Sequence, residues 1–258
     1  MTISASLDTV LQALRRPGER LRSLIAALQP DQLEGPVYPT EWTVAEVLSH
    51  LGSAAVISKR RIDDMLAGRS MPDDFPQSVW DEWNAKSPTA KVNDGLAAGR
   101  ALIERIEATS DDERASFHMA FGPVEFDLTG FVGLRLNEHA MHTWDIEVVG
   151  DPATVLPPDA AELIVDNLDL IGRFTAKPTG SDRTIAVRTS APTRSFAIVL
   201  TPDTATFGTG TADQAPDLEL SAEAFSRLVY GRLDAQHTPA FGGEAAALDE
   251  LRRVFPGP

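Results

Sequence analysis

Residues 43–68 have the sequence TVAEVLSHLGSAAVISKRRIDDMLAG, and this stretch decides the fold because it specifies a long helix with both of its ends. Thr43 and Glu46 fit a capping box, in which each side chain accepts a hydrogen bond from the backbone amide of the other residue. Apolar residues then recur every three or four positions, as on one face of a helix: Val44, Val47, Leu48, Leu51, Ile57, Ile62 and Met65. Gly68 follows as a C-terminal cap. We therefore predict an amphipathic helix from Val44 to Gly68.

Three other segments of the first half show the same helical period: residues 7–28, 92–108 and 129–146. The first contains Pro17-Gly18, so it is either one kinked helix or two short helices. The Pro-rich stretch from Met71 to Pro88 is expected to be irregular. Four long amphipathic segments predict a four-helix bundle in which at least one connection is too long to be a turn.

The pattern changes after Pro152, where short β-branched segments replace the long helices. Strands are expected at 184–189, 195–200, 205–207 and 217–220, and helices at 157–174, 222–230 and 244–254. This mixture is typical of an α+β unit, and about 105 residues are enough for a core of its own. We predict two domains: a four-helix bundle over residues 1–152, which would bind a metal, and a smaller α+β domain over 153–258.

The composition excludes several classes of function. The 258 residues include no cysteine, so the chain cannot form a disulfide, an iron–sulfur cluster or a zinc site with cysteine ligands. The formal net charge of −15 makes DNA, RNA and anionic membranes unfavourable partners. No apolar stretch reaches the ~18 residues of a membrane span, and the first residues lack the features of a signal peptide. We expect a cytoplasmic monomer or homodimer that acts on small molecules.

Without cysteine, a metal site must use histidine, aspartate and glutamate. Glu138 and His142 are four residues apart on the last helix of the bundle, so both side chains project from one face. A bundle can bring His50, on the second helix, opposite that face. The three side chains would then form a set suited to catalytic zinc or Fe(II). An ordinary explanation also stays open, because a Glu–His pair can be a solvated helix contact and a lone histidine can be a hydrogen-bonded core residue.

Two neighbours on the same helix have open roles. Asp145, three residues beyond His142, is either a surface charge or a carboxylate that orients the imidazole. His139 is an alternative to Glu138, because it too lies close to His142 on the helix.

Residues outside that helix also have more than one interpretation. Trp80 and Trp83 line a pocket, form a lid or pack in a core. Arg232, which follows the expected helix at 222–230, reaches an anionic ligand or is an ordinary exposed arginine.

Several segments together resemble one family. Residues 39–51, PTEWTVAEVLSHL, resemble the signature P-x-x-W-T-V-x-x-[LV]-x-x-H-L of the DinB-like, mycothiol-dependent maleylpyruvate isomerase family. Residues 138–145, EHAMHTWD, are similar to its E-x-x-x-H-x-x-D segment. In the second half, LELS (218–221), LVYGR (228–232) and LRRVFPG (251–257) resemble the sterol-carrier-like C-terminal domain of the same family. The resemblance spans nearly the whole chain and implies a DinB-like four-helix bundle followed by a sterol-carrier-like domain.

The resemblance also implies specific roles for residues of this chain. It implies a divalent metal, usually zinc, held by His50, Glu138 and His142, with mycothiol as a thiol co-substrate. An arginine of the C-terminal domain holds the anionic substrate in the founding activity, and Arg232 is the candidate here. The family often has a histidine before the metal-binding glutamate, where this chain has Asn137. This departure indicates a substrate pocket different from that of the isomerase.

These features predict a metal-dependent, mycothiol-using enzyme that acts on a small electrophile, as an isomerase or an S-transferase. A thiol with a pKa of about 8.5 would lose its proton on coordination to zinc. The metal-bound thiolate would add to an electron-poor double bond. Bond rotation and elimination would then give cis–trans isomerisation, whereas retention of the sulfur would give S-transfer. Two alternatives stay open: a hydrolase that uses a metal-bound water, and a non-catalytic module that binds a small molecule or a metal.

Overall fold

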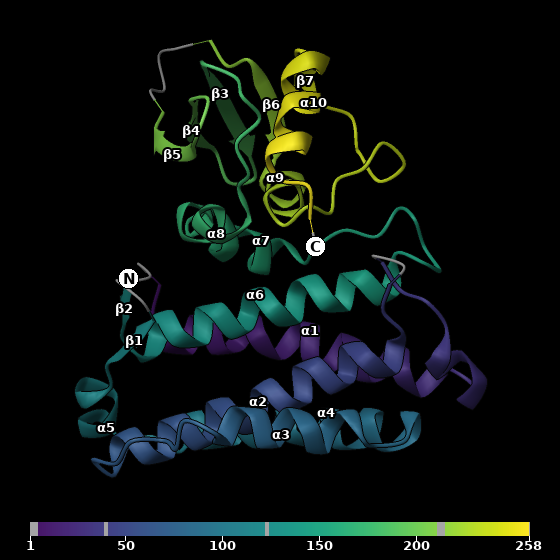
Figure 1. The fold of residues 1–258 in the computed structure, drawn as a ribbon, viewed down its shortest axis with the longest axis vertical. Coiled ribbons are helices and arrows are strands. Elements are labelled where there is room, and N and C mark those ends of the chain that lie inside the picture. Colours follow the sequence, from purple (N-terminus) through teal and green to yellow (C-terminus); the bar gives the residue numbers. More distant parts are fainter. Residues whose placement is uncertain (1–4, 39–40, 122–123, 211–214, 258) are drawn as a thin grey trace. The chain divides into compact units, whose positions relative to one another are not determined.

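The computed structural model describes residues 5–38, 41–121, 124–210 and 215–257. The chain forms two compact units, residues 1–150 and 151–258. The first is helical, and the second combines helices with a mixed five-stranded sheet (Figure 1), which confirms the predicted fold class. Among the described residues, every helix is too short or too polar to cross a membrane. Pro39 and Thr40, at the start of the signature segment, lie outside the described residues.

The N-terminal unit is built from four long helices: α1 (Leu7–Ala27), α2 (Val44–Leu66), α4 (Pro88–Glu107) and α6 (Leu128–Glu147). α1 packs along α6 and α2 packs along α4, so the bundle consists of two layers (Figure 1). α1 is a single helix that continues through the buried Pro17. Shorter elements fill the connections: η1 (Pro30–Glu34), α3 (Phe75–Asn84), α5 (Asp111–Ser116), and the antiparallel strands β1 (Met119–Phe121) and β2 (Val124–Phe126). The predicted four-helix bundle is confirmed.

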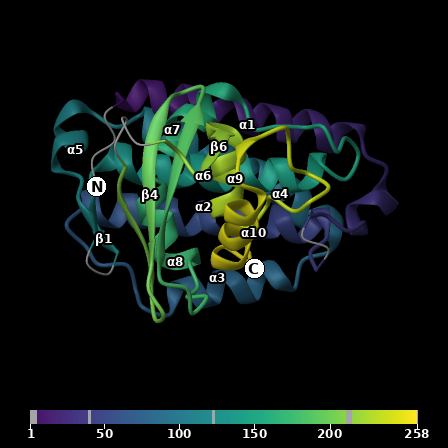
Figure 2. The ribbon, with the colours of Figure 1, turned by 90° about the horizontal axis from the view of Figure 1, so that it is seen from above.

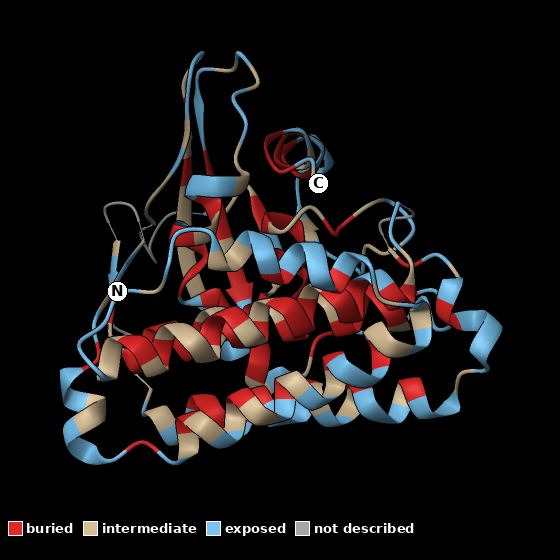
Figure 3. Cartoon of the chain, turned by 60° about the horizontal axis from the view of Figure 1, so that its bottom comes forward, coloured by how far each residue is buried: buried red, intermediate tan, exposed pale blue. Residues whose placement is uncertain are grey.

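Helix α2 begins with the predicted capping box. The hydroxyl of Thr43 accepts a hydrogen bond from the amide of Glu46 at 3.2 Å, and the carboxylate of Glu46 accepts one from the amide of Thr43 at 2.7 Å. These two bonds satisfy amides that have no acceptor within the helix. The apolar face then turns inward, and buried residues line the inner sides of the bundle helices (Figure 3). The start of α2 therefore fixes which of its residues lie in the core.

The stretch Met71–Pro88 is not irregular throughout, so that expectation was wrong. Ten of its residues form α3, and Pro76 lies in the first turn, where a helix tolerates proline because the amide has no intrahelical acceptor. α3 packs on α2 and buries Trp83, which is 3% exposed and contacts Ile57, whereas Trp80 is 47% exposed. An amphipathic ten-residue helix thus covers the outer side of α2.

The C-terminal unit has the strand order β5-β4-β3-β6-β7. Its strands are β3 (Arg183–Ser190), β4 (Arg194–Leu200), β5 (Ala205–Thr209), β6 (Leu218–Ser221) and β7 (Gly242–Gly243). β3 and β6 are parallel, and the other neighbours are antiparallel. Figure 2 shows β4 and β6 of this sheet from above.

The helices of this unit are α7 (Pro158–Val165), α8 (Leu168–Thr175), α9 (Ala222–Val229) and α10 (Ala245–Val254). The single helix expected from residue 157 is therefore two helices, α7 and α8. Aromatic rings join the sheet to the helices: Phe196 and Phe207 of the sheet contact Phe225 of α9, and Phe207 also contacts Phe255. The second unit therefore has its own apolar core.

Candidate metal centre

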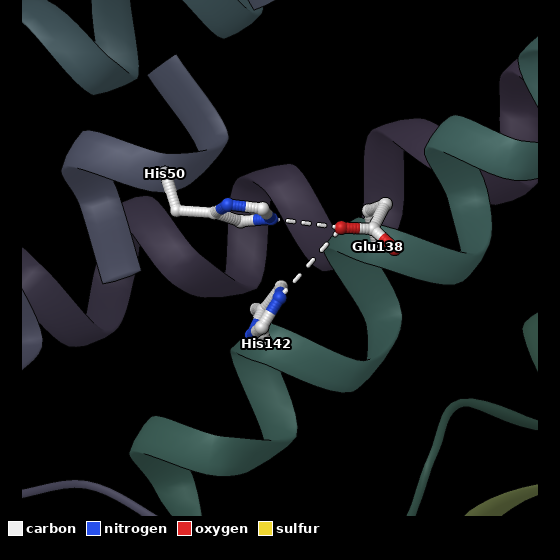
Figure 4. A group of neighbouring side chains, drawn as sticks. All are labelled: His50, Glu138 and His142. Atoms are coloured by element: carbon white, nitrogen blue, oxygen red, sulfur yellow. Dashed lines mark hydrogen bonds and ion pairs between the residues drawn. The ribbon is translucent and has the colours of Figure 1, made fainter. Parts of the chain in front are cut away.

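Three side chains from two helices of the bundle converge on one point (Figure 4). His50 projects from α2, while Glu138 and His142 lie one turn apart on α6. Nε2 of His50 is 2.9 Å from Oε2 of Glu138, and Nε2 of His142 is 3.7 Å from the same oxygen. One ligand atom from each residue lies within 4.8 Å of the other two. The structure therefore brings together the three residues that the sequence suggested.

The spacing and chemistry of this cluster fit a divalent metal ion. A tetrahedral ion with bonds of about 2.1 Å holds its ligand atoms about 3.4 Å apart, and the two distances to Glu138 lie on either side of this value. Two imidazole nitrogens and one carboxylate oxygen are typical of catalytic zinc, in which the fourth position is open to water or substrate. The same set also suits Fe(II). His50, Glu138 and His142 could therefore hold a metal and leave it accessible to a ligand.

Asp145 orients one of these three side chains. Its Oδ2 is 2.9 Å from Nδ1 of His142, and the residue is 1% exposed, so it is not a surface charge. A proton on Nδ1 leaves the lone pair of Nε2 directed at the cluster. Histidines that bind metals usually donate their second ring N–H to such a carboxylate. Asp145 is therefore positioned to fix the orientation of the His142 ring from the side away from the cluster.

Neighbouring charges keep Glu138 ionised. Burial alone would raise its pKa, but the hydrogen bond from His50 and the electrostatic interactions with His142, His50 and Arg135 lower that pKa to about 2. The sequence analysis did not identify Arg135, which is buried and donates a hydrogen bond to the carbonyl of Leu51 at 3.2 Å. Its position three residues before Glu138 on α6 was the available signal.

Trp42 is a second residue that the sequence analysis missed at this site. Its ring stacks on His142, with centroids 5.7 Å apart and an interplanar angle of 11°, and it also lies 5.3 Å from the ring of His50. A pocket of about 300 Å³ extends from His50 and is lined by Trp42, Trp80, Trp83 and Lys91. The two tryptophans of α3 thus line a pocket beside His50, and Trp83 also packs in the core.

His139 does not join the cluster, although it lies next to Glu138 in the sequence. It faces α4, where its Cε1 would be 3.7 Å from a Cβ on Gly99. Burial, followed by the positive charge of Arg135, lowers the pKa of His139 to about 3, so its imidazole is neutral at pH 7. Asn137, on the other side of Glu138 in the sequence, is buried too.

Arg232 lies in the C-terminal unit, directly after α9. It is 6% exposed, and its guanidinium donates a hydrogen bond to the carbonyl of Tyr230 at 2.8 Å. Its own carbonyl accepts a bond from Arg227, which pairs with Glu223 inside the same unit. Arg232 is therefore not an ordinary exposed arginine.

The fold and the cluster define a class of protein: a helical bundle with a His–Glu–His group between two helices, followed by an α+β unit. Residues 14–147 match the family model described as the mycothiol maleylpyruvate isomerase N-terminal domain. This match covers more than half of the chain, and the chain belongs to that family.

Solved structures show the same fold across both units. The crystal structure of the mycothiol-dependent maleylpyruvate isomerase has a TM-score of 0.66 at 13% identity, covering 93% of this chain and 98% of that one. A histidine-to-alanine mutant of a mycothiol-dependent maleylpyruvate isomerase gives a TM-score of 0.65 at 12% identity, with 90% and 92% covered. At such identity the likeness concerns the fold alone.

Curated relatives are similar in sequence but carry no assigned activity. Two uncharacterized proteins, from the CDC 1551 and H37Rv strains of Mycobacterium tuberculosis, are each 26% identical over 181 residues. The matched region is 67% of this chain and 87% of each relative.

Proposed function

We propose that the protein is a metal-dependent enzyme that uses a low-molecular-weight thiol, mycothiol, on a small electrophilic substrate. The observation that carries this proposal is the convergence of His50, Glu138 and His142 in a bundle of the mycothiol maleylpyruvate isomerase family. Members of this fold include a mycothiol-dependent maleylpyruvate isomerase. Because this chain has no cysteine, the reacting sulfur must come from a co-substrate.

The chain's own residues would prepare the site for this chemistry. His50, Glu138 and His142 would hold the ion, preferably Zn²⁺, while Asp145 fixes the ring of His142 through Nδ1. A bound divalent ion would supply the Lewis acidity that lowers the pKa of a thiol. Trp42 stacks on the ring of His142 beside the cluster.

The reaction class follows from the chemistry of a thiol with an electron-poor double bond. The sulfur forms a bond to one carbon, and the electron pair of the double bond moves into the activating group. Rotation about the resulting single bond and expulsion of the sulfur regenerate the thiol and give cis–trans isomerisation. If the neighbouring carbon instead takes up a proton, the sulfur stays attached and the result is S-transfer.

We further propose that Arg232 binds an anionic group of the substrate. The proposal rests on the family resemblance, which implies that an arginine of the C-terminal domain holds the anionic substrate. Arg232→Lys should then raise the KM for a dicarboxylate electrophile and leave the KM for an uncharged one unchanged.

The test combines a thiol with a panel of electrophiles. Zinc-loaded wild type is incubated with mycothiol and each electrophile, and both thiol consumption and cis–trans conversion are followed. We expect thiol-dependent turnover that falls at least about 100-fold in His50→Ala and His142→Ala. His118→Ala is the matched control, because His118 is exposed and outside the cluster, and it should behave as wild type.

Three outcomes would contradict the proposal. Activity that survives in both cluster variants would show that the site is not used. Turnover without any thiol would indicate a hydrolase that uses water. Tight metal binding without turnover on the whole panel would indicate a binding module.

A further inference from the structure

A second pocket lies in the bundle, at the seam between α1 and α4. We name it the α1–α4 pocket; its volume is about 270 Å³, and its apolar wall consists of Leu21, Leu48, Leu51, Leu96 and Ile103. The metal-cluster residues do not line it. An engineered apolar cavity of about 150 Å³ is large enough to bind benzene, so this pocket can hold a substituted ring.

Two glycines of α4 line this pocket. A Cβ on Gly95 would lie 2.5 Å from the carbonyl oxygen of Leu48, so this glycine lets α4 approach α2 closely. Gly99 lies one turn later and is not closely packed. A Cβ there would lie 3.7 Å from Cε1 of His139, an ordinary van der Waals distance. The absence of a side chain at Gly99 therefore leaves the ring of His139 uncovered on the pocket side.

His139 is the polar group inside the pocket. The residue is 7% exposed, and its Nδ1 is fully buried without a hydrogen-bond partner among the described residues. Nε2 also makes no hydrogen bond within the described ranges, but it is not fully buried. Polar atoms in such sites normally bond to protein, water or a ligand, and Nε2 is the ring nitrogen that a ligand can reach. The Cε1–Nε2 edge of the ring lies beside Gly99, and both residues line the pocket. The imidazole is thus directed at the space in which a ligand would lie.

The charges around the pocket favour an uncharged ligand. Three arginines and three glutamates line it, so their charges balance. Arg15 pairs with Glu107, and Arg22, Arg100, Glu19 and Glu104 are exposed to solvent at the rim. An ionised group deeper in the pocket would lose its hydration against leucine and isoleucine side chains, which is costly.

We propose that the α1–α4 pocket binds a small uncharged apolar molecule that carries one hydroxyl group bonded to His139. A hydroxyl both donates and accepts, so it can pair with Nε2 in either tautomer of the imidazole. The body of the ligand fills the space above Gly99 and packs on Leu48, Leu51 and Leu96. This site is separate from the metal cluster and does not depend on the proposed enzymatic activity.

The test compares p-cresol with toluene, which has nearly the same shape but lacks the hydroxyl. Both are titrated calorimetrically into wild type, His139→Leu and Gly99→Leu. We expect wild type to bind p-cresol about tenfold more tightly than toluene. This ratio corresponds to the free energy that one additional hydrogen bond can contribute to binding. His139→Leu should bring the two affinities to within about twofold of each other. Gly99→Leu fills the pocket and should abolish the binding of both.

Controls separate this site from the metal centre and from loss of folding. His118→Leu, at an exposed histidine outside the pocket, should bind both probes as wild type does. The circular dichroism spectrum and the thermal unfolding transition of every variant should match those of wild type, which shows that the bundle is folded. Should Gly99→Leu fail to fold, Gly99→Ala adds one methyl group in ordinary contact with His139 and should weaken p-cresol binding.

Three results would overturn the proposal, whether or not the protein is an enzyme. The first is a wild-type protein that binds neither probe at millimolar concentration. The second is a folded Gly99→Leu variant with wild-type affinity. The third is an undiminished preference for p-cresol in His139→Leu.

Discussion

Asp145 is a buried carboxylate that we expect to raise the affinity of the site for zinc. It contacts Nδ1 of His142 at 2.9 Å and leaves Nε2 free to bind an ion. Asp145→Asn keeps the shape but removes the negative charge that orients and polarises the imidazole. We expect a 10- to 100-fold loss of zinc affinity, measured by competition with a chromophoric chelator. An unchanged affinity would show that Asp145 does not support the site.

Glu250 gives a prediction for pH dependence in the other unit. It accepts hydrogen bonds from Thr179 at 2.6 Å and Ser181 at 2.7 Å, and it pairs with Arg253. The two hydroxyls, opposed by burial and aided by Arg253, lower its pKa from 4.5 to about 2. A lowered carboxyl pKa stabilises the folded state fully above pH 4.5, and this contribution is lost as the pH falls towards 2.

Glu250→Gln tests this directly. The variant should be less stable than wild type by about 2 kcal/mol at neutral pH, and the difference should shrink between pH 4.5 and 2. Urea unfolding of both proteins across this range measures the difference. A gap that is constant with pH would show that the ionised form is not the one stabilised.

At the scale of helices, the close approach of α2 and α4 depends on Gly95. Its missing Cβ would lie 2.5 Å from the backbone oxygen of Leu48, which cannot move without displacing α2. Gly95→Ala should therefore destabilise the protein by about 2–3 kcal/mol. Gly18→Ala is the matched control, because it also lies in a helix and nothing is within 4 Å of its added Cβ. Thermal unfolding should show a lower Tm for the first variant and an unchanged or higher Tm for the second.

Helices with clear local signals could be predicted, and those without such signals could not. The capping box at Thr43 and the apolar period that follows it determine α2 from neighbouring residues alone. α3 was missed because prolines flank it, and a proline in the first turn of a helix looks the same in sequence as one in a loop. The two-layer arrangement of the bundle depends on long-range packing, which helical periodicity does not specify.

At the scale of the whole chain, the cluster joins residues from two distant helices. Helical spacing places Glu138 and His142 on one face of α6, and this much is local. His50 lies 88 residues before Glu138, so its approach depends on how the bundle packs. Trp42 was missed for the same reason, because its contacts with His50 and His142 arise only when α2 and α6 meet. The predicted bundle made this approach possible, and the family resemblance then implied it.

The metal content of the purified protein decides whether His50, Glu138 and His142 form a metal site. We predict that wild-type protein binds about one Zn²⁺ per chain, and that His50→Ala and His142→Ala each lose this ion while His118→Ala keeps it. Elemental analysis after dialysis against zinc, together with circular dichroism to verify folding, measures the outcome. A wild-type protein that holds no divalent metal, or folded cluster variants that retain a full equivalent, would contradict the account.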